Sequence, residues 1–279
     1  MCRDTALNLR QRLADLAREM PDAPVRRVVV GVHKTAVASR TVGCAYTLRD
    51  EVGAAHLCAE IQDSGRLRKR SAHDLAGRLT SARCLERSLG MAAVNSLLTQ
   101  PAPEWQSGDI LAWMKTRFTG ARVGMIGHFP FAPEIRSWAG EFRVIEQRPI
   151  ADDLPASQGA AWLAKCDAVI ITGVTLLNDT LPEILRAAAG AWKLMLGPTV
   201  PPHPLLLDLG LDALTCVVCD DEDTYWPYLL EGAIVPRYQG TRLVTLAQER
   251  LALPPGDFRE RLTRALDRSN QPEAAAGTA

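Results

Sequence analysis

The chain has 279 residues, of which 47% are hydrophobic, and its 32 basic residues balance 32 acidic ones. This length suits two domains or one large one, and the neutral balance argues against nucleic acid or a membrane surface as a partner. No stretch reaches the roughly 20 apolar residues of a membrane span, and the N-terminus lacks an apolar run of signal-peptide type, so we expect a cytoplasmic protein.

Residues 1–108 predict a smaller α+β domain. Apolar residues at three- and four-residue spacing predict helices, at 5–20, 72–79 and 82–98. Runs rich in β-branched residues predict an antiparallel meander of three strands, at 25–32, 35–47 and 55–61. Residues 99–108 contain two prolines and one glycine among polar residues without any period, and are predicted to form a linker.

Residues 109–268 show a different pattern, in which short apolar strands alternate with helices. The strands are expected at 122–126, 142–146, 168–172, 193–196 and 214–218, and the helices at 110–118, 133–139, 157–165, 181–189, 204–209 and 224–231. Two further helical patterns fall within 237–268, and residues 269–279 are predicted to be a disordered tail. Such alternation indicates an α/β fold with a Rossmann-like, doubly wound parallel sheet.

Ligands of such sheets bind at the carboxyl ends of the strands. Glycines, hydroxyl groups and other polar residues gather near those ends, which is the composition of a ligand-binding cleft: Gly124, Gly127, His128, Phe129, Glu146, Thr172, Gly173, Thr175, Asn178, Gly197 and Thr199. Thr35 and Asn95 are the candidates from the first half of the chain. At each single position a structural role, as a tight turn or a helix cap, is the alternative.

The turn after residues 122–126 resembles part of a dinucleotide fingerprint. Gly124 and Gly127 have Gly-x-x-Gly spacing, one glycine short of the full pattern, and Pro130 removes an N–H donor that a pyrophosphate would need. Glu146 lies 22 residues after Gly124, near the place of a ribose-binding acid. A nucleoside cofactor without pyrophosphate, such as S-adenosylmethionine, therefore stays open.

Metal-ligating residues give a weaker pattern. Cys216 and Cys219 form a Cys-x-x-Cys, but no second pair accompanies it, and residues three apart on a strand point to opposite faces. The acidic run that follows is expected to cap the next helix. His33, His128 and His203 each adjoin a turn and are the candidate metal ligands if the fold brings them together.

Three blocks of sequence resemble a family described as a "putative heavy-metal chelation" domain. They are 123–127 with Phe129 and Pro130, 171–176 with Asn178, and 196–199; Gly43 and Asn95 resemble its preceding domain. The resemblance implies an enolase-N-terminal-like domain before a Rossmann-like one, with the proposed active site in the cleft between them. It also implies matched cleft positions at Gly124, Gly127, Thr172, Gly173, Thr175, Asn178 and Thr199.

We therefore expect a small-ligand-binding protein whose interdomain cleft handles a heavy-metal ion or a metal complex. An enzyme that uses S-adenosylmethionine, with Glu146 on the ribose, is the alternative. A non-catalytic partner in metal uptake or cofactor assembly is a third hypothesis, and a homodimer stays open. The sequence identifies neither a catalytic residue nor the ligand.

Overall fold

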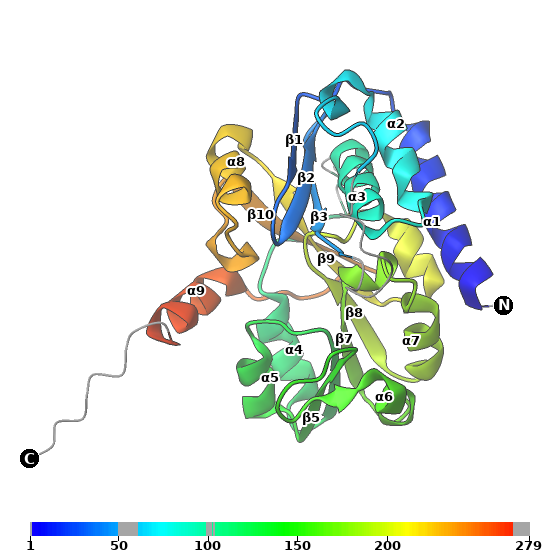
Figure 1. The fold of residues 1–279 in the computed structure, drawn as a ribbon. Helices are drawn as coiled ribbons and strands as arrows, with labels where there is room; N and C mark the ends of the chain where they lie inside the picture. The colour runs from blue at the N-terminus through cyan, green and yellow to red at the C-terminus, as the bar shows by residue number, and fades with distance from the viewer. Residues whose placement is uncertain (1, 50–60, 99–101, 103, 270–279) are drawn as a thin grey trace, which may run out of the picture.

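The computed structural model describes residues 2–49, 61–98, 102 and 104–269. Its N-terminal domain combines helices with a three-stranded antiparallel sheet in the order β1-β2-β3. The elements are α1 (Cys2–Glu19), β1 (Arg27–Val30), β2 (Lys34–Ala38), β3 (Val42–Tyr46), α2 (Ala72–Ala76) and α3 (Cys84–Leu98), with 3-10 turns at Leu67–Lys69 and Gly77–Thr80. In Figure 1 this domain, blue to cyan, lies above the middle of the larger sheet.

The meander is present, but its strands differ from the expectation. The run 35–47 is two strands, β2 and β3, because the chain reverses at Ser39–Thr41, where the Ser39 N–H donates to the Thr41 carbonyl (2.9 Å). The expected strand at 55–61 lies outside the described residues apart from Ile61. Helix α3 packs directly on β3, since a Cβ on Gly43 would lie 2.1 Å from the Ala92 carbonyl oxygen.

The second domain is built on a seven-stranded sheet in the order β10-β9-β8-β7-β4-β5-β6. Its strands are β4 (Arg122–Ile126), β5 (Glu141–Glu146), β6 (Leu154–Pro155), β7 (Ala168–Thr172), β8 (Trp192–Leu196), β9 (Ala213–Cys219) and β10 (Thr241–Ala247). All neighbouring strands are parallel except β9 and β10. Strand β4 lies between β5 and β7, so the strand order reverses there, as in dinucleotide-binding folds.

Helices cover both faces of this sheet. They are α4 (Ile110–Phe118), α5 (Ala132–Trp138), α6 (Ala156–Leu163), α7 (Leu181–Ala187), α8 (Glu222–Leu230) and α9 (Phe258–Ser269). Apolar residues of α4, α5 and α9 form one core with one face of the sheet. The other face shares a continuous apolar core with α6, α7 and the N-terminal helices. The two domains are thus joined by buried contacts.

Strand β10 corrects one expectation, because it occupies the place of the first of the two helical patterns expected within 237–268. Val244 and Leu246 belong to one apolar core and Leu243 and Ala247 to the other, so the apolar residues on both sides of one strand imitate helical spacing. Residues 204–209 form a 3-10 helix. The tail from 270 onward lies outside the described residues.

The fold class expected from the sequence is confirmed: a Rossmann-like parallel sheet preceded by a smaller α+β domain. Asp109 caps α4 by accepting from the Ala112 N–H. Asp221 caps α8 in the same manner, as expected for the acidic run that follows Cys219. In the part of the chain that is described, no helix combines the length and apolar character needed to cross a bilayer.

Candidate functional site

The reversal point of the sheet brings two predicted residues into contact. Gly127 follows β4 with φ +89°, and a Cβ there would lie 2.9 Å from Thr172 Cγ2 at the end of β7. Both the backbone conformation and the close approach require glycine. Gly124, by contrast, lies inside β4, where a Cβ would lie 3.2 Å from Cys166 Sγ and from a Leu163 methyl. It allows α6 to pack and does not reach the edge of the sheet.

Glu146 and His128 lie together at the end of β5. The Glu146 carboxylate accepts from the backbone N–H of His128 (Oε1, 3.1 Å), and His128 Nε2 lies 2.7 Å from Oδ2 of Asp153. The Asp153 side chain is only 4% exposed, whereas that of His128 is 40% exposed. Phe129 stacks on Phe131 with ring centroids 4.9 Å apart, which makes it part of the packing of α5.

The turn after β7 satisfies most of its polar groups locally. Thr175 Oγ1 donates to the Thr172 carbonyl (2.8 Å), and Thr172 Oγ1 accepts from the Val174 N–H (3.3 Å). Asn178 Oδ1 accepts from both the N–H and the hydroxyl of Thr180. These contacts shape the loop that leads into α7.

The ends of β7 and β8 also touch, and the N-terminal domain covers them. A Cβ on Gly173 would lie 2.8 Å from Val200 Cγ2 and 3.0 Å from Thr199 Cβ. Thr199 is buried, and its Oγ1 accepts from the backbone N–H of Tyr46 on β3 (2.9 Å). Gly197, with φ +127°, has open space where its Cβ would lie.

Asn95 contacts the same loop from α3. Its Nδ2 donates to the Cys44 carbonyl (2.9 Å) and to the carbonyls of Pro198 and Thr199 (3.2 and 3.3 Å). Asn95 therefore joins the two domains. Thr35 does not contact the Thr199 loop; its hydroxyl forms a hydrogen bond with Thr47 Oγ1 (3.0 Å).

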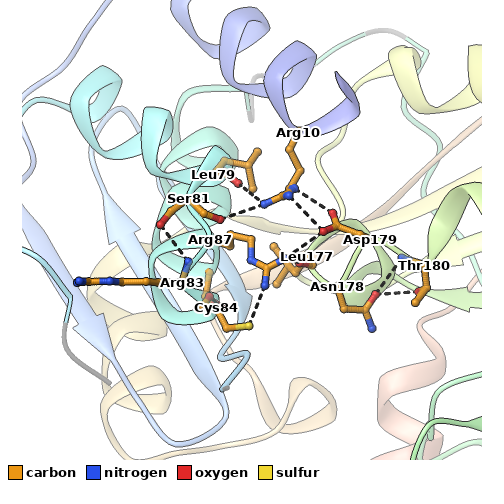
Figure 2. Close-up of polar contacts among 11 residues, drawn as sticks. Arg10, Leu79, Ser81, Arg83, Cys84, Arg87, Leu177, Asn178, Asp179 and Thr180 are labelled. Carbon is orange, nitrogen blue, oxygen red and sulfur yellow. Dashed lines mark hydrogen bonds and ion pairs between the residues drawn. The ribbon is translucent and has the colours of Figure 1, made fainter. Parts of the chain in front are cut away.

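A second junction between the domains is charged and was not predicted. Asp179, in the loop before α7, bonds two guanidinium groups, those of Arg10 on α1 and Arg87 on α3 (Figure 2). Arg87 also donates to the Leu177 carbonyl (2.6 Å) and to Cys84 Sγ (2.9 Å). Burial lowers the pKa of Arg10, although Asp179 opposes this. We call these three charged residues the arginine clamp.

The face of the small sheet that packs against α8 carries further polar groups, which were not among the predicted site residues. Lys34 on β2 pairs with Tyr46 on β3, and its Nζ lies 5.1 Å from the Tyr46 ring centroid. Cys44 lies on the same face, beside Tyr225 and Tyr238. Burial lowers the pKa of Lys34 and raises the pKa of Cys44 to about 11.

The candidate metal ligands remain apart. His128 bonds Asp153, and His203 Nδ1 accepts from the Leu205 N–H at the start of a 3-10 helix, with burial lowering its pKa. His33 adjoins Gly232. Within the described ranges, no three His, Cys, Asp or Glu side chains gather in an arrangement that could hold a metal ion.

The two cysteines of the Cys-x-x-Cys lie on opposite sides of β9. Cys216 belongs to the core shared by the sheet and the N-terminal helices, and Cys219 packs against the cluster around α8. Burial raises the pKa of both thiols, that of Cys219 to about 12. The strand geometry therefore prevents them from acting as a ligand pair.

Comparison with known proteins adds two kinds of match. The DUF364 family model, described as "Putative heavy-metal chelation", matches residues 109–248, and the DUF4213 model, with the same description, matches 13–98. None of the curated proteins matches the chain.

Solved structures of two DUF364 proteins of unknown function are also similar. The one from Desulfitobacterium hafniense is 22% identical, with a TM-score of 0.73 over 86% of this chain and 99% of its own. The one from Pyrococcus horikoshii is 20% identical, with a TM-score of 0.70 over 88% and 100%. At these identities the likeness concerns the fold.

Proposed function

Because the chain belongs to the DUF364 family, described as "Putative heavy-metal chelation", we propose that it binds a small polar ligand, such as a metal complex, between its two domains. The ligand lies at the carboxyl edge of β4, β7 and β8. The observation that carries this proposal is the convergence of three strand ends under the N-terminal domain. Gly127 contacts Thr172, Gly173 contacts Thr199, and Asn95 bonds the Thr199 loop from above.

The residues at this edge favour a complex over a bare cation. They offer hydroxyl groups, backbone amides and glycines, and the described part of the chain assembles no set of three ligating side chains. Heavy-metal ions are held in proteins chiefly by thiolates and imidazoles. A metal that reaches the cleft is therefore cargo that arrives with its own ligands, and the protein recognises the polar exterior of the complex.

Native mass spectrometry of protein purified without chelators tests the proposal. We expect a bound small molecule, or saturable binding of molybdate or ferric citrate in calorimetry. Thr172→Val removes an edge hydroxyl at constant shape and should weaken that binding about 10-fold. The control Thr116→Val, on the exposed side of α4, should bind as the wild type does. A protein that carries no ligand and binds neither probe would refute the proposal.

A second candidate function rests on the position of Glu146. The strand order places this carboxylate at the end of the strand next to β4, where dinucleotide folds bind a ribose. Its two oxygens each accept a backbone N–H, from His128 and Gln147, and each retains a lone pair for a ribose hydroxyl. S-adenosylmethionine is the ligand of this alternative.

Calorimetry with S-adenosylmethionine separates the two functions. If the alternative holds, the wild type binds and Glu146→Gln abolishes binding. Glu141→Gln, at the opposite end of the same strand, is the matched control and should bind normally. If the wild type shows no heat of binding, the nucleoside alternative fails and the first proposal is unaffected.

A further inference from the structure

The imidazole ring of His128 is oriented by a buried carboxylate. Its Nε2 lies 2.7 Å from Oδ2 of Asp153, whose side chain is only 4% exposed. The same Oδ2 also accepts the backbone N–H of Ile150 (2.9 Å). Because an ionised carboxylate only accepts hydrogen bonds, Nε2 is the donor in its contact with His128. The ring is therefore held in one tautomer, with its lone pair on Nδ1.

The lone pair of Nδ1 is available to a ligand. Within the described ranges no protein group bonds to this nitrogen, and the His128 side chain is 40% exposed. In contrast, His203 Nδ1 accepts the Leu205 N–H, and His73 Nε2 lies 2.9 Å from the Met20 carbonyl oxygen. Histidines that bind metals typically donate one ring N–H to a carboxylate and coordinate through the other nitrogen. His128 has this arrangement.

His128 also lies beside the proposed ligand. It follows Gly127, whose turn touches Thr172 at the end of β7, and it donates its backbone N–H to Glu146 at the end of β5. Neighbouring strands lie about 4.8 Å apart, so the ends of β5 and β7, on the two sides of β4, are about 10 Å apart. A small metal chelate over the end of β4 is large enough to contact Thr172 on one side and His128 on the other.

We infer that His128 Nδ1 binds the metal of the complex directly, with Asp153 as the positioning residue that fixes the ring. The lone pair of Nδ1 replaces a water molecule on the metal, and no proton is released. The complex brings its remaining ligands, since no three ligating side chains gather in the described part of the chain. This inference rests on the proposed function and narrows its ligand to a chelate of a divalent transition metal such as Ni²⁺ or Cu²⁺, which imidazole suits.

The variant His128→Gln separates metal binding from a purely structural role. Glutamine can place an N–H donor near the position of Nε2, so the bond to Asp153 can persist, but it has no nitrogen lone pair in place of Nδ1. In calorimetry with Ni²⁺–citrate we expect His128→Gln to weaken binding about 10-fold or more, and Asp153→Asn about 10-fold. The matched control His73→Gln, on α2 outside the cleft, should bind as the wild type does.

Spectroscopy of protein labelled with ¹⁵N in its histidines reads out the ring itself. In the ligand-free wild type at about pH 8, the His128 signals should show a protonated Nε2 and an unprotonated Nδ1. Asp153→Asn should give a mixture of tautomers, which a role confined to loop structure would not require. With Cu²⁺–citrate bound, pulsed electron paramagnetic resonance should detect a ¹⁵N coupling that His128→Gln removes.

The outcomes separate this inference from the proposed function. If the wild type binds Ni²⁺–citrate and His128→Gln binds it equally well, the inference is overturned and the cleft proposal stands. A proton on Nδ1 of His128 in the free protein, or bound Cu²⁺–citrate without a histidine coupling, would also overturn it. If the wild type carries no small molecule and binds neither the citrate complexes nor molybdate, the proposed function fails and the inference fails with it.

Discussion

Replacing Asp179 by asparagine removes the carboxylate that Arg10 and Arg87 share. The variant keeps the shape of the side chain but leaves two guanidinium groups facing each other at the domain junction. Arg10 contributes contacts of 3.1 and 3.0 Å to Asp179, and Arg87 one of 3.3 Å. The arginine side chains are 8% and 12% exposed and that of Asp179 is 31% exposed. Solvent therefore screens this cluster only in part.

The expected cost follows from these exposures. Removing one partner of a buried ion pair costs about 3–5 kcal/mol. Because Asp179 is partly exposed, we expect Asp179→Asn to lower the free energy of unfolding by about 2–3 kcal/mol. Arg10→Met should cost less in the Asp179→Asn background than in the wild type, because there it also relieves a repulsion. The double-mutant cycle should give a coupling energy of about 2 kcal/mol.

Urea unfolding followed by tryptophan fluorescence measures all four proteins. Asp15→Asn is the control, since Asp15 pairs with Arg18 on the surface of α1 with both side chains about half exposed. It should change stability by no more than about 0.5 kcal/mol. A coupling energy below about 0.5 kcal/mol between Arg10 and Asp179 would refute the argument that this carboxylate holds the junction together.

Three further predictions concern single residues. Gly127→Ala should destabilise the protein by about 1–3 kcal/mol in urea unfolding, through positive φ and the contact with Thr172, whereas Gly190→Ala, with open space around it, should not. Asn95→Asp replaces a donor to three carbonyls by a carboxylate, and should cost at least about 2 kcal/mol and weaken ligand binding; unchanged stability would contradict it. Lys34→Met should stabilise the ligand-free protein at pH 7. Because burial lowers the folded pKa of Lys34, the native state binds its proton less tightly than the unfolded chain, so this gain should shrink as the pH rises toward 10.5; a pH-independent difference would count against it.

The sequence predicted five of the seven strands of the second domain, because each of the five is a short apolar run, and the turns after β4, β7 and β8 contain glycine or hydroxyl residues; the two-residue strand β6 and strand β10 were missed. Those turns are in contact in the structure, as Gly127 with Thr172 and Gly173 with Thr199. Apolar runs revealed the other strands, but the apolar residues of β10 led to a helix being predicted there. With apolar residues on both faces, its pattern carries no two-residue alternation, and periodicity alone cannot separate it from a helix.

Because residues 35–47 were predicted as one strand, the prediction did not show which side of the small sheet Lys34 faces. Taken as one strand, the run gives no reason to pair its two ends. With the reversal at Ser39–Thr41, positions 34, 36 and 38 share a face with 42, 44 and 46, so Lys34 and Cys44 face the same side. Recognising Ser39-Arg40-Thr41 as a turn would have predicted that Lys34 and Cys44 lie on the same face.

The arginine clamp could not be found from the sequence. Arg10 and Asp179 are 169 positions apart, and each side chain alone is typical of a solvated surface. Only the docking of α1 and α3 beside the loop before α7 brings them together. Whether the remaining cleft residues hold a ligand stays a prediction, which the binding experiments above address.

The same separation along the chain has a consequence during synthesis. Arg10 and Arg87 leave the ribosome long before Asp179, and at about 5–20 residues per second the interval after Arg10 is roughly 10–30 s. From the synthesis of Arg87 onward, the nascent N-terminal domain contains two guanidinium groups whose counter-charge has not been made. Its final compaction must therefore wait for the loop before α7, so that the first segment translated is among the last to complete its folding.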